Sequence, residues 1–408
     1  MRIRTKGKGI IRRALLLCLC AVLLAGTAGA EEIVDINEYA FSDVIYQDTL
    51  ADGRVLLAGS GDPSGMLRPR LLCLNTNRTV SWEYLDETAG RYIGAAVLAD
   101  GRIGAVLWED GEEQDTGFIL QFFTQTGLRA GEEIRIPVPV DAYDNNLTAN
   151  RLLFEEQGDD GKYYLYDWDG HEIAVLREPG MMFTFRNMIE EEDGLVLFGV
   201  AGAGNKYLSY TPEIVKTDMQ GGTIWKQVPD RIWPKTFELG FMYVVPAEDG
   251  GYLAIRSELQ KEGKKNGPAV YRSALEKLNR SGESLWRKTE GLEDETGACR
   301  GLVRSGGKIA AIYHTVDQEA ESYIRDDPLL FRWFDENGKP LGTTELNLSR
   351  EDFERLGQYT DADSIVDVRY DYHLVPMPDG LWATASLLVS GADGDVAADL
   401  LLVKVPEL

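Results

Sequence analysis

The chain is poor in cysteine and histidine. Its 408 residues include four cysteines, and Cys18 and Cys20 lie close to the N-terminus, so only Cys73 and Cys299 belong to the main part of the chain. Two cysteines do not make a disulfide framework, and both a single bridge and two buried thiols stay open. A zinc site usually shows close pairs of ligands. None is expected here, because the histidines are far apart in sequence: His171, His314 and His373.

Positive charge is also scarce. The 42 basic and 67 acidic residues give a net charge of −25. Six of the basic residues and none of the acidic ones lie in the segment 1–30, so the remainder carries −31. Nucleic acids and anionic lipids are bound by clusters of lysine and arginine. We therefore expect neither as a partner.

The segment 1–30 has the pattern of a secretory signal peptide. A basic stretch precedes the apolar run Ala14–Ala25, and Ala28-Gly29-Ala30 supplies small residues for cleavage. The run is short for a membrane span, and an uncleaved N-terminal anchor is the alternative. We expect residues 31–408 to form one exported domain, secreted or at the cell surface, with no membrane span after cleavage.

Two turn patterns recur along residues 31–408. The first is a turn, in most copies Asp-Gly, before a short apolar strand, a strong hairpin signal because the turn needs positive φ. Its copies are Asp52-Gly53, Asp100-Gly101, Asp193-Gly194, Asp249-Gly250, Gly306-Gly307, Asp379-Gly380 and a degenerate Ala149-Asn150. The second is Asp/Asn/Thr-x-x-Gly, with Arg78 in the glycine position of the first copy, and it is followed in the best copies by tryptophan. Its copies begin at Asn75, Thr124, Asp167, Asp218, Asn279 and Asp335.

These patterns predict units of four antiparallel strands, A to D, repeated at intervals of about 40–60 residues as in a β-propeller. We expect an all-β fold of seven blades. Strand A begins near Ile45, Ile93, Asp141, Phe183, Phe241, Arg300 and Tyr370. An insertion at 344–368 is expected to hold one short helix. The last unit lacks strand D, so we expect residues 32–36 to supply it and close the ring.

The strand pattern in 249–286, with Asn279, Gly282 and Trp286, resembles the repeats of exported bacterial β-propellers of the quinoprotein-like, or PQQ-repeat-like, group. That resemblance implies the fold, because the group contains both enzymes and scaffolds. Its quinone-dependent dehydrogenases use adjacent cysteines and a calcium site. Since residues 31–408 hold no adjacent cysteines, we expect no quinone cofactor.

Calcium is an open alternative to the expectation of no cofactor. Calcium needs several oxygen ligands on a tight loop, and no segment fits the EF-hand spacing. The acidic groups that come closest are Asp159, Asp160, Asp167 and Asp169; Asp361, Asp363 and Asp367; and Asp393 with Asp395.

The unit predicts two unlike faces. The A–B and C–D turns lie on one face, called here the short-turn face. The B–C loops, including 257–268 and 315–328, and the D–A connections lie on the other, the long-loop face, where binding residues are expected to concentrate. We predict a monomeric scaffold that binds a protein or a glycan at the cell surface through that face. The predicted binding residues are Trp108, Tyr207, Trp233, Arg256, Lys264, Tyr323 and Arg325. The alternative is an extracellular carbohydrate-active hydrolase or lyase with carboxylates at the central channel.

Overall fold

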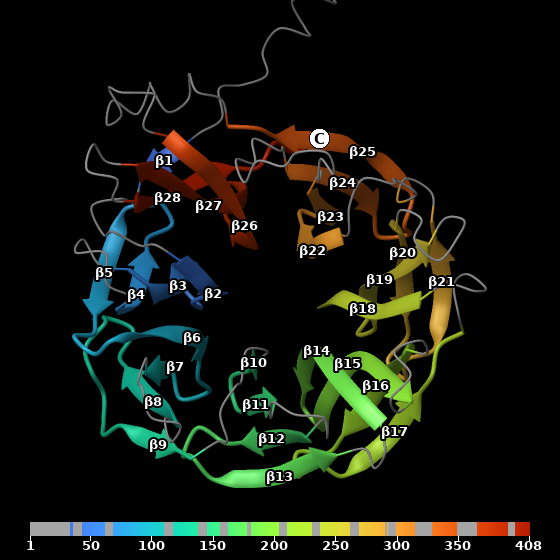
Figure 1. Ribbon diagram of the computed structural model, residues 1–408, viewed down its shortest axis with the longest axis horizontal. Coiled ribbons are helices and arrows are strands. Elements are labelled where there is room, and N and C mark those ends of the chain that lie inside the picture. The colour runs from blue at the N-terminus through green and yellow to red at the C-terminus, as the bar shows by residue number, and fades with distance from the viewer. Residues whose placement is uncertain are drawn as a thin grey trace, which may run out of the picture.

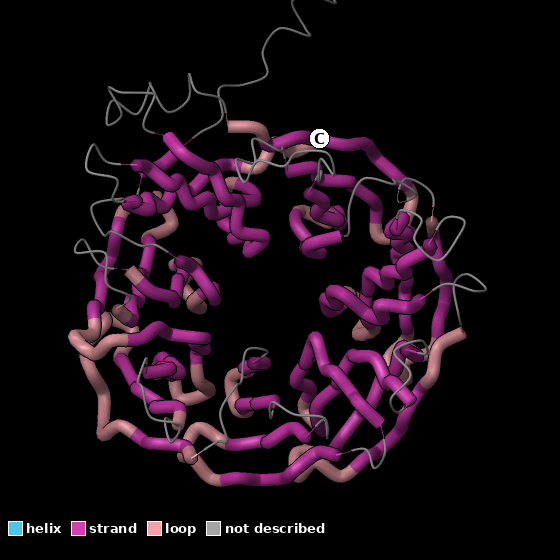
Figure 2. Tube along the Cα trace, viewed as in Figure 1, coloured by secondary structure: helices cyan, strands magenta, loops and turns pink. Residues whose placement is uncertain are grey.

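A computed structural model describes the chain over 15 segments, counting Leu292 as one. They are 33–35, 43–61, 68–109, 117–137, 145–155, 162–177, 181–203, 210–230, 237–261, 269–289, 292, 299–314, 329–348, 365–390 and 396–408. In these segments strands are joined by turns and loops, and no helix is present (Figure 2). Accordingly, none of the described residues forms a helix long and apolar enough to cross a membrane. The expected signal peptide, 1–30, lies outside these segments.

The strands form four-stranded antiparallel sheets arranged around a common axis (Figure 1). Blade 1 contains β2 (Asp43–Thr49), β3 (Val55–Ser60), β4 (Pro69–Leu74) and β5 (Val80–Leu85). Blade 2 contains β6 (Gly90–Val97), β7 (Ile103–Glu109), β8 (Phe118–Phe123) and β9 (Ile134–Ile136). Blade 3 contains β10 (Asn145–Leu147), β11 (Leu152–Glu155), β12 (Lys162–Tyr166) and β13 (Glu172–Arg177). Blade 4 contains β14 (Met181–Glu191), β15 (Gly194–Ala203), β16 (Tyr210–Thr217) and β17 (Thr223–Gln227).

The remaining sheets follow the same order. Blade 5 contains β18 (Phe237–Pro246), β19 (Tyr252–Lys261), β20 (Ala269–Leu278) and β21 (Ser284–Lys288). Blade 6 contains β22 (Cys299–Ser305), β23 (Lys308–His314), β24 (Leu329–Asp335) and β25 (Pro340–Leu346). A further sheet, blade 7, joins β26 (Ile365–Met377), β27 (Gly380–Ser390) and β28 (Val396–Lys404) to β1 (Ile33–Asp35). The all-β propeller with four-stranded antiparallel blades is thus confirmed.

Blade 7 is built from segments far apart in sequence. β1 pairs antiparallel with β28, placing Val34 opposite Leu402 (Figure 1). The innermost strands contact one another in the order β2, β6, β10, β14, β18, β22 and β26, and β26 contacts β2 again. Behind the innermost strands, apolar side chains pack between neighbouring sheets, as do Leu329, Phe331 and Leu381 between blades 6 and 7. Burial of such side chains is the main favourable term holding the sheets together.

Several predicted strand limits were wrong. β26 begins at Ile365 rather than near Tyr370, and β25 extends to Leu346. The predicted insertion at 344–368 is therefore too long at both ends, and its predicted helix lies outside the described residues. The strand signal missed at 365–372 is the alternation of Val366, Val368 and Tyr370 with charged residues, which is the period of a half-buried strand.

The turn chemistry agrees with the sequence pattern. In the A–B turn of blade 1, Gly53 has φ of 84°, and the Asp52 carboxylate accepts the backbone N–H of Arg54 at 3.2 Å. In the C–D turn of blade 5, the Asn279 Oδ1 accepts the N–H groups of Ser281 and Glu283 at 3.0 and 2.9 Å. These local bonds satisfy backbone groups that have no ladder partner in the turn.

The Gly-x-x-x-Trp spacing has a structural cause between blades. The tryptophan of strand D packs on the C–D turn glycine of the next blade. A Cβ at Gly127 would lie 2.6 Å from the Trp82 ring, and one at Gly338 would lie 2.6 Å from the Trp286 ring. The glycine therefore serves twice, supplying positive φ for its own turn and space for the neighbouring tryptophan.

The contact between blades 7 and 1 departs from this rule. Arg78 occupies the glycine position of the turn, with φ of 70°. Its guanidinium lies 4.2 Å from the ring centroid of the buried Trp382 and is ion-paired with Asp379. On the same indole, Lys404 Nζ lies 5.7 Å from the ring centroid. A cation–aromatic contact thus replaces the glycine–tryptophan contact at the junction of blades 7 and 1.

Cys73 and Cys299 are both buried and free, so the alternative of a disulfide bridge was wrong. They belong to β4 in blade 1 and β22 in blade 6. Burial raises the pKa of the Cys73 thiol to about 11, which keeps it protonated and unreactive.

Candidate functional site

Most of the residues predicted to bind on the long-loop face lie outside the described residues: Tyr207, Trp233, Lys264, Tyr323 and Arg325. Binding through that face therefore stays a prediction. The structure places the other two predicted residues, Trp108 and Arg256, in different blades and does not bring them together.

Trp108 lies near the end of β7, opposite Arg91 of β6. The Arg91 guanidinium is 5.1 Å from the ring centroid of Trp108. The tryptophan is half-buried and contacts the core between blades 2 and 3. The arginine of its own blade thus covers part of the aromatic surface that was expected to meet a partner.

Arg256 is a buried ion-pair residue, contrary to its predicted place in a binding surface. Its side chain is 1% exposed, and Nη1 donates to Glu276 Oε2 at 3.0 Å. Nη2 donates to the backbone carbonyl of Asp230 at 3.0 Å, and Arg287 donates to the other oxygen of Glu276 at 2.8 Å. Because Glu276 is fully buried, its charge requires these partners. Arg256 therefore holds blade 5 together.

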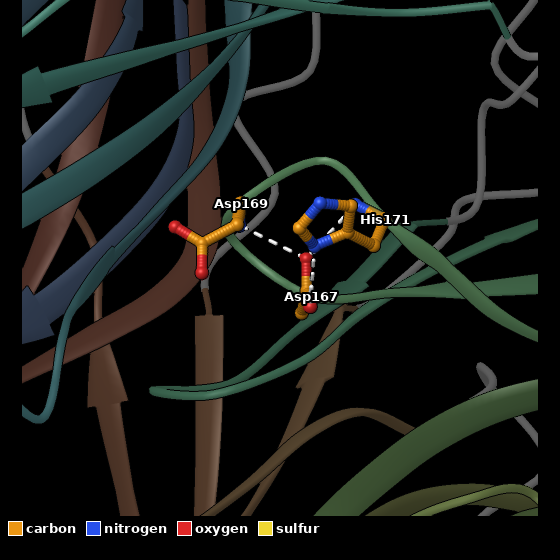
Figure 3. A group of neighbouring side chains, drawn as sticks. All are labelled: Asp167, Asp169 and His171. Atoms are coloured by element: carbon orange, nitrogen blue, oxygen red, sulfur yellow. Dashed lines mark hydrogen bonds and ion pairs between the residues drawn. The ribbon is translucent and has the colours of Figure 1, made fainter.

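Among the acidic groups considered for calcium, Asp167 and Asp169 lie beside His171 in the C–D turn of blade 3 (Figure 3). Asp167 Oδ1 accepts the backbone N–H groups of Asp169 and His171 at 3.0 and 2.9 Å. Its Oδ2 lies 3.3 Å from His171 Nδ1. Asp218 and Asp335 make the same two backbone bonds in their own turns. Turn formation thus accounts for this group.

A pocket of about 610 Å³ opens between blades 4 and 5 on the short-turn face. It is of the size of small-molecule sites in proteins. The A–B turn and strands C and D of blade 4 meet the C–D turn of blade 5 there. The lining residues are Glu192, Asp193, Lys216 and Trp225 from blade 4, and Asn279, Arg280 and Ser281 from blade 5.

One side of the pocket is a closed network of charges. Lys216 is 6% exposed, and its Nζ donates to Glu191 Oε2 and Asp193 Oδ1, both at 2.6 Å. Tyr252 of blade 5 donates its hydroxyl to Glu191 Oε1 at 2.6 Å. Two of the three donors of the Lys216 ammonium are thus used, and the network ties the two blades together.

The pKa values follow from these contacts. Burial acts to lower the pKa of Lys216, but the hydrogen bonds to Asp193 and Glu191 outweigh it and the pKa is raised. The hydrogen bond from Lys216 lowers the pKa of Asp193. Burial and the hydrogen bond to Glu191 raise the pKa of Tyr252. At neutral pH the lysine and aspartate are held charged and the tyrosine is held neutral.

The other side of the pocket carries side chains that are exposed to solvent. The Arg280 side chain is 66% exposed, and its contact with Glu191 is long, at 3.7 Å between Nε and Oε2. Glu192 of the opposite blade is exposed, and the half-buried Trp225 lines the same pocket. A Cβ at Gly282 would lie 3.0 Å from the Trp225 ring, so part of the indole packs on the blade 5 turn.

The junction between blades 5 and 6 is built from the corresponding turn residues, but an arginine bridges the two turns there. Lys277 donates to Asp249 Oδ1 at 2.8 Å, as Lys216 does to Asp193. In the sequence of the A–B turns, Glu248 takes the position of Glu192. In the sequence of the C–D turns, Glu336 takes the position of Arg280. Arg304 bridges them, with contacts of 2.6 and 2.9 Å.

The position of Arg304 explains why the earlier junction stays open. Arg304 pairs with Ile309 in blade 6, and the corresponding pair in blade 5 is Pro246 with Tyr252. Proline has no side-chain donor, so no bridge of this kind forms at the junction of blades 4 and 5. Sequence reasoning missed this pocket because its residues belong to turns of two different blades.

No family model and no curated protein matches the sequence. Among solved structures, polysaccharide lyase Uly1 is similar, with a TM-score of 0.51 and 9% identity over 92% of this chain and 99% of that chain. A chain in the crystal structure of the Mitotic Checkpoint Complex has a TM-score of 0.49 and 11% identity over 92% and 91%. The Penicillium chrysogenum α-L-arabinanase complexed with arabinobiose has a TM-score of 0.44 and 9% identity over 91% and 98%. At these identities the likeness shows the β-propeller fold alone.

Proposed function

We propose that this chain is a β-propeller binding scaffold without catalytic activity, exported from the cell, that takes its partner at the pocket between blades 4 and 5. The observation that supports this proposal most is the arrangement of the pocket. Trp225 and Arg280 are open to a ligand, whereas Asp193 beside them is held in the charged form by its hydrogen bond from Lys216.

The protonation states favour binding over catalysis. A glycoside hydrolase needs a carboxylic acid with a raised pKa as proton donor. Asp193, in the pocket, has a lowered pKa because Lys216 donates to it. A lyase needs a base that is available near neutral pH. Tyr252 and Lys216 both have raised pKa values, so neither is suited to remove a proton.

Export is proposed from the signal-peptide pattern of the segment 1–30, with cleavage after Ala30. The partner would then be met outside the cell or at its surface. Mass spectrometry of the protein secreted by an expression host tests this part. We expect a mature N-terminus at Glu31, and retention of the intact leader would contradict it.

The function is tested by offering residues 31–408 a panel of oligosaccharides and following both binding and turnover. Calorimetry measures binding, and chromatography of the recovered sugar measures cleavage. We expect saturable binding with the sugar returned unchanged. Release of shorter products would contradict the scaffold proposal and favour the hydrolase or lyase alternative.

A further inference from the structure

We infer that the pocket between blades 4 and 5 is a binding site for a neutral sugar residue, stacked on Trp225 and oriented by Arg280 and Glu192. This inference rests on the proposed scaffold function and names the ligand class of the same site. It draws on the charge pattern of the pocket, on its aromatic surface, and on the contrast with the next junction.

The charges of the pocket are mixed and nearly balanced. The pocket is lined by two carboxylates, Glu192 and Asp193, and by two cations, Lys216 and Arg280. An anionic ligand would meet the carboxylates of Glu192 and Asp193, and a cationic ligand would meet an ammonium and a guanidinium. A neutral ligand avoids both repulsions. It would still find donors at Arg280 and Lys216 and acceptors at Glu192 and Asp193.

A sugar ring matches this combination of groups. Each hydroxyl both donates and accepts, so a ring can use donors such as Arg280 and acceptors such as Glu192 together. The C–H face of the ring is apolar and suits the indole of Trp225, since large rigid aromatic surfaces contribute strongly to recognition. Asn279 contributes to the shape of the pocket rather than to binding, because its Oδ1 accepts two backbone N–H groups and its Nδ2 donates to Glu283 Oε2 at 2.7 Å.

The junction of blades 5 and 6 supports the assignment by contrast. Trp286 packs on Gly338 there as Trp225 packs on Gly282. However, Arg304 bonds both Glu248 and Glu336, so the groups that a sugar would need are occupied. The two junctions therefore supply a matched control. Removing Trp225 or Trp286 loses the same kind of tryptophan–glycine packing, but only Trp225 lines the pocket.

The test is isothermal titration of residues 31–408 with four neutral trisaccharides, maltotriose, cellotriose, mannotriose and galactotriose, and with anionic trigalacturonate. At least one neutral trisaccharide is expected to bind, and trigalacturonate is expected to bind at least about tenfold more weakly because the carboxylates of Glu192 and Asp193 repel it. The Arg280→Ala and Glu192→Gln variants change exposed side chains and leave the fold intact. Each is expected to weaken binding by about tenfold, the size of one lost hydrogen bond to a charged group.

Tryptophan variants complete the test. Trp225→Phe is expected to retain part of the affinity, and Trp225→Ala is expected to abolish measurable binding. The control variant Trp286→Ala should bind as the unchanged chain does. Circular dichroism and the unfolding midpoint establish that each variant is folded before titration.

The outcomes separate this inference from the proposed function. Sugar binding that is unchanged in Arg280→Ala, Glu192→Gln and Trp225→Phe overturns the site and leaves the scaffold standing. Tighter binding of trigalacturonate than of every neutral sugar overturns the ligand class. Failure of all five sugars to bind overturns the inference, and capture of a protein partner would then support the scaffold by another route. Sugar cleavage overturns the scaffold itself.

Discussion

The junction of blades 4 and 5 and the junction of blades 5 and 6 are assembled from nearly the same turns. Each has a tryptophan on a glycine and a lysine bonded to the aspartate of its own A–B turn. They differ where the two turns face each other across the junction. Arg304 closes one by bridging Glu248 and Glu336, while Glu192 and Arg280 remain apart at the other. The repeat supplies the framework of a site, and the omission of one bridging side chain leaves the site open.

The glycine positions should show the largest effects. Gly338 has φ of 73°, and a Cβ there would lie 2.6 Å from the Trp286 ring. Gly338→Ala combines a left-handed backbone penalty with overpacking, so it should lower the free energy of unfolding by roughly 2–4 kcal/mol. At Gly282 the corresponding distance to Trp225 is 3.0 Å, so Gly282→Ala should cost less, about 1–2 kcal/mol.

Urea denaturation of both glycine variants checks this order. An equal loss in the two variants would mean that the open junction is packed as tightly as the closed one. A loss in neither would mean that the tryptophans do not rest on these glycines, and the structural account of the Gly-x-x-x-Trp spacing would fail.

The two arginines should separate stability from binding. Arg304→Ala removes two part-exposed ion pairs and leaves Glu248 and Glu336 unbridged, so it should destabilise the fold by about 1 kcal/mol. Arg280→Ala removes one long contact and should change stability by less than about 0.5 kcal/mol. Denaturation and sugar titration of each variant check this. If Arg304→Ala weakens sugar binding as Arg280→Ala does, the two junctions are not functionally distinct.

The smallest effect concerns pH and should be shared by both junctions. Hydrogen bonds from Lys216 and Lys277 lower the pKa values of Asp193 and Asp249. A carboxyl with a lowered folded pKa contributes stability above its unfolded pKa of about 4, and that contribution is lost as pH falls further. The midpoints of Asp193→Asn and Asp249→Asn should therefore differ slightly from the unchanged chain at pH 7 and converge with it below about pH 4. A difference that grows on acidification would contradict these assignments.

The turns could be predicted from the sequence because their chemistry is local. Asn279 caps a turn with residues two and four positions later, so the pattern and the contact coincide. The same locality revealed the blades, since each turn separates two strands that pair. The start of β26 was missed although residues 365–372 alternate, because the long interval between the strand A positions near Arg300 and Tyr370 suggested an insertion.

The site could not be predicted, because its contacts join turns of different blades. Glu192 and Arg280 are far apart in sequence, and nothing near either residue shows that they border one pocket. Arg256 gave the opposite error. It was predicted to bind a partner, but its hydrogen bonds to Glu276 and to the carbonyl of Asp230 hold it in the interior of the blade. A charged side chain in a strand can therefore form an ion pair within its blade instead of binding a ligand.

The most direct test of the central claim is a crystal structure of residues 31–408 with the best-binding neutral trisaccharide. The account predicts one sugar ring stacked on Trp225, with Arg280 and Glu192 within hydrogen-bond distance of its hydroxyls and the junction of blades 5 and 6 free of sugar. Density for the sugar on the long-loop face, or between carboxylates in the central channel, with none at Trp225, would contradict it.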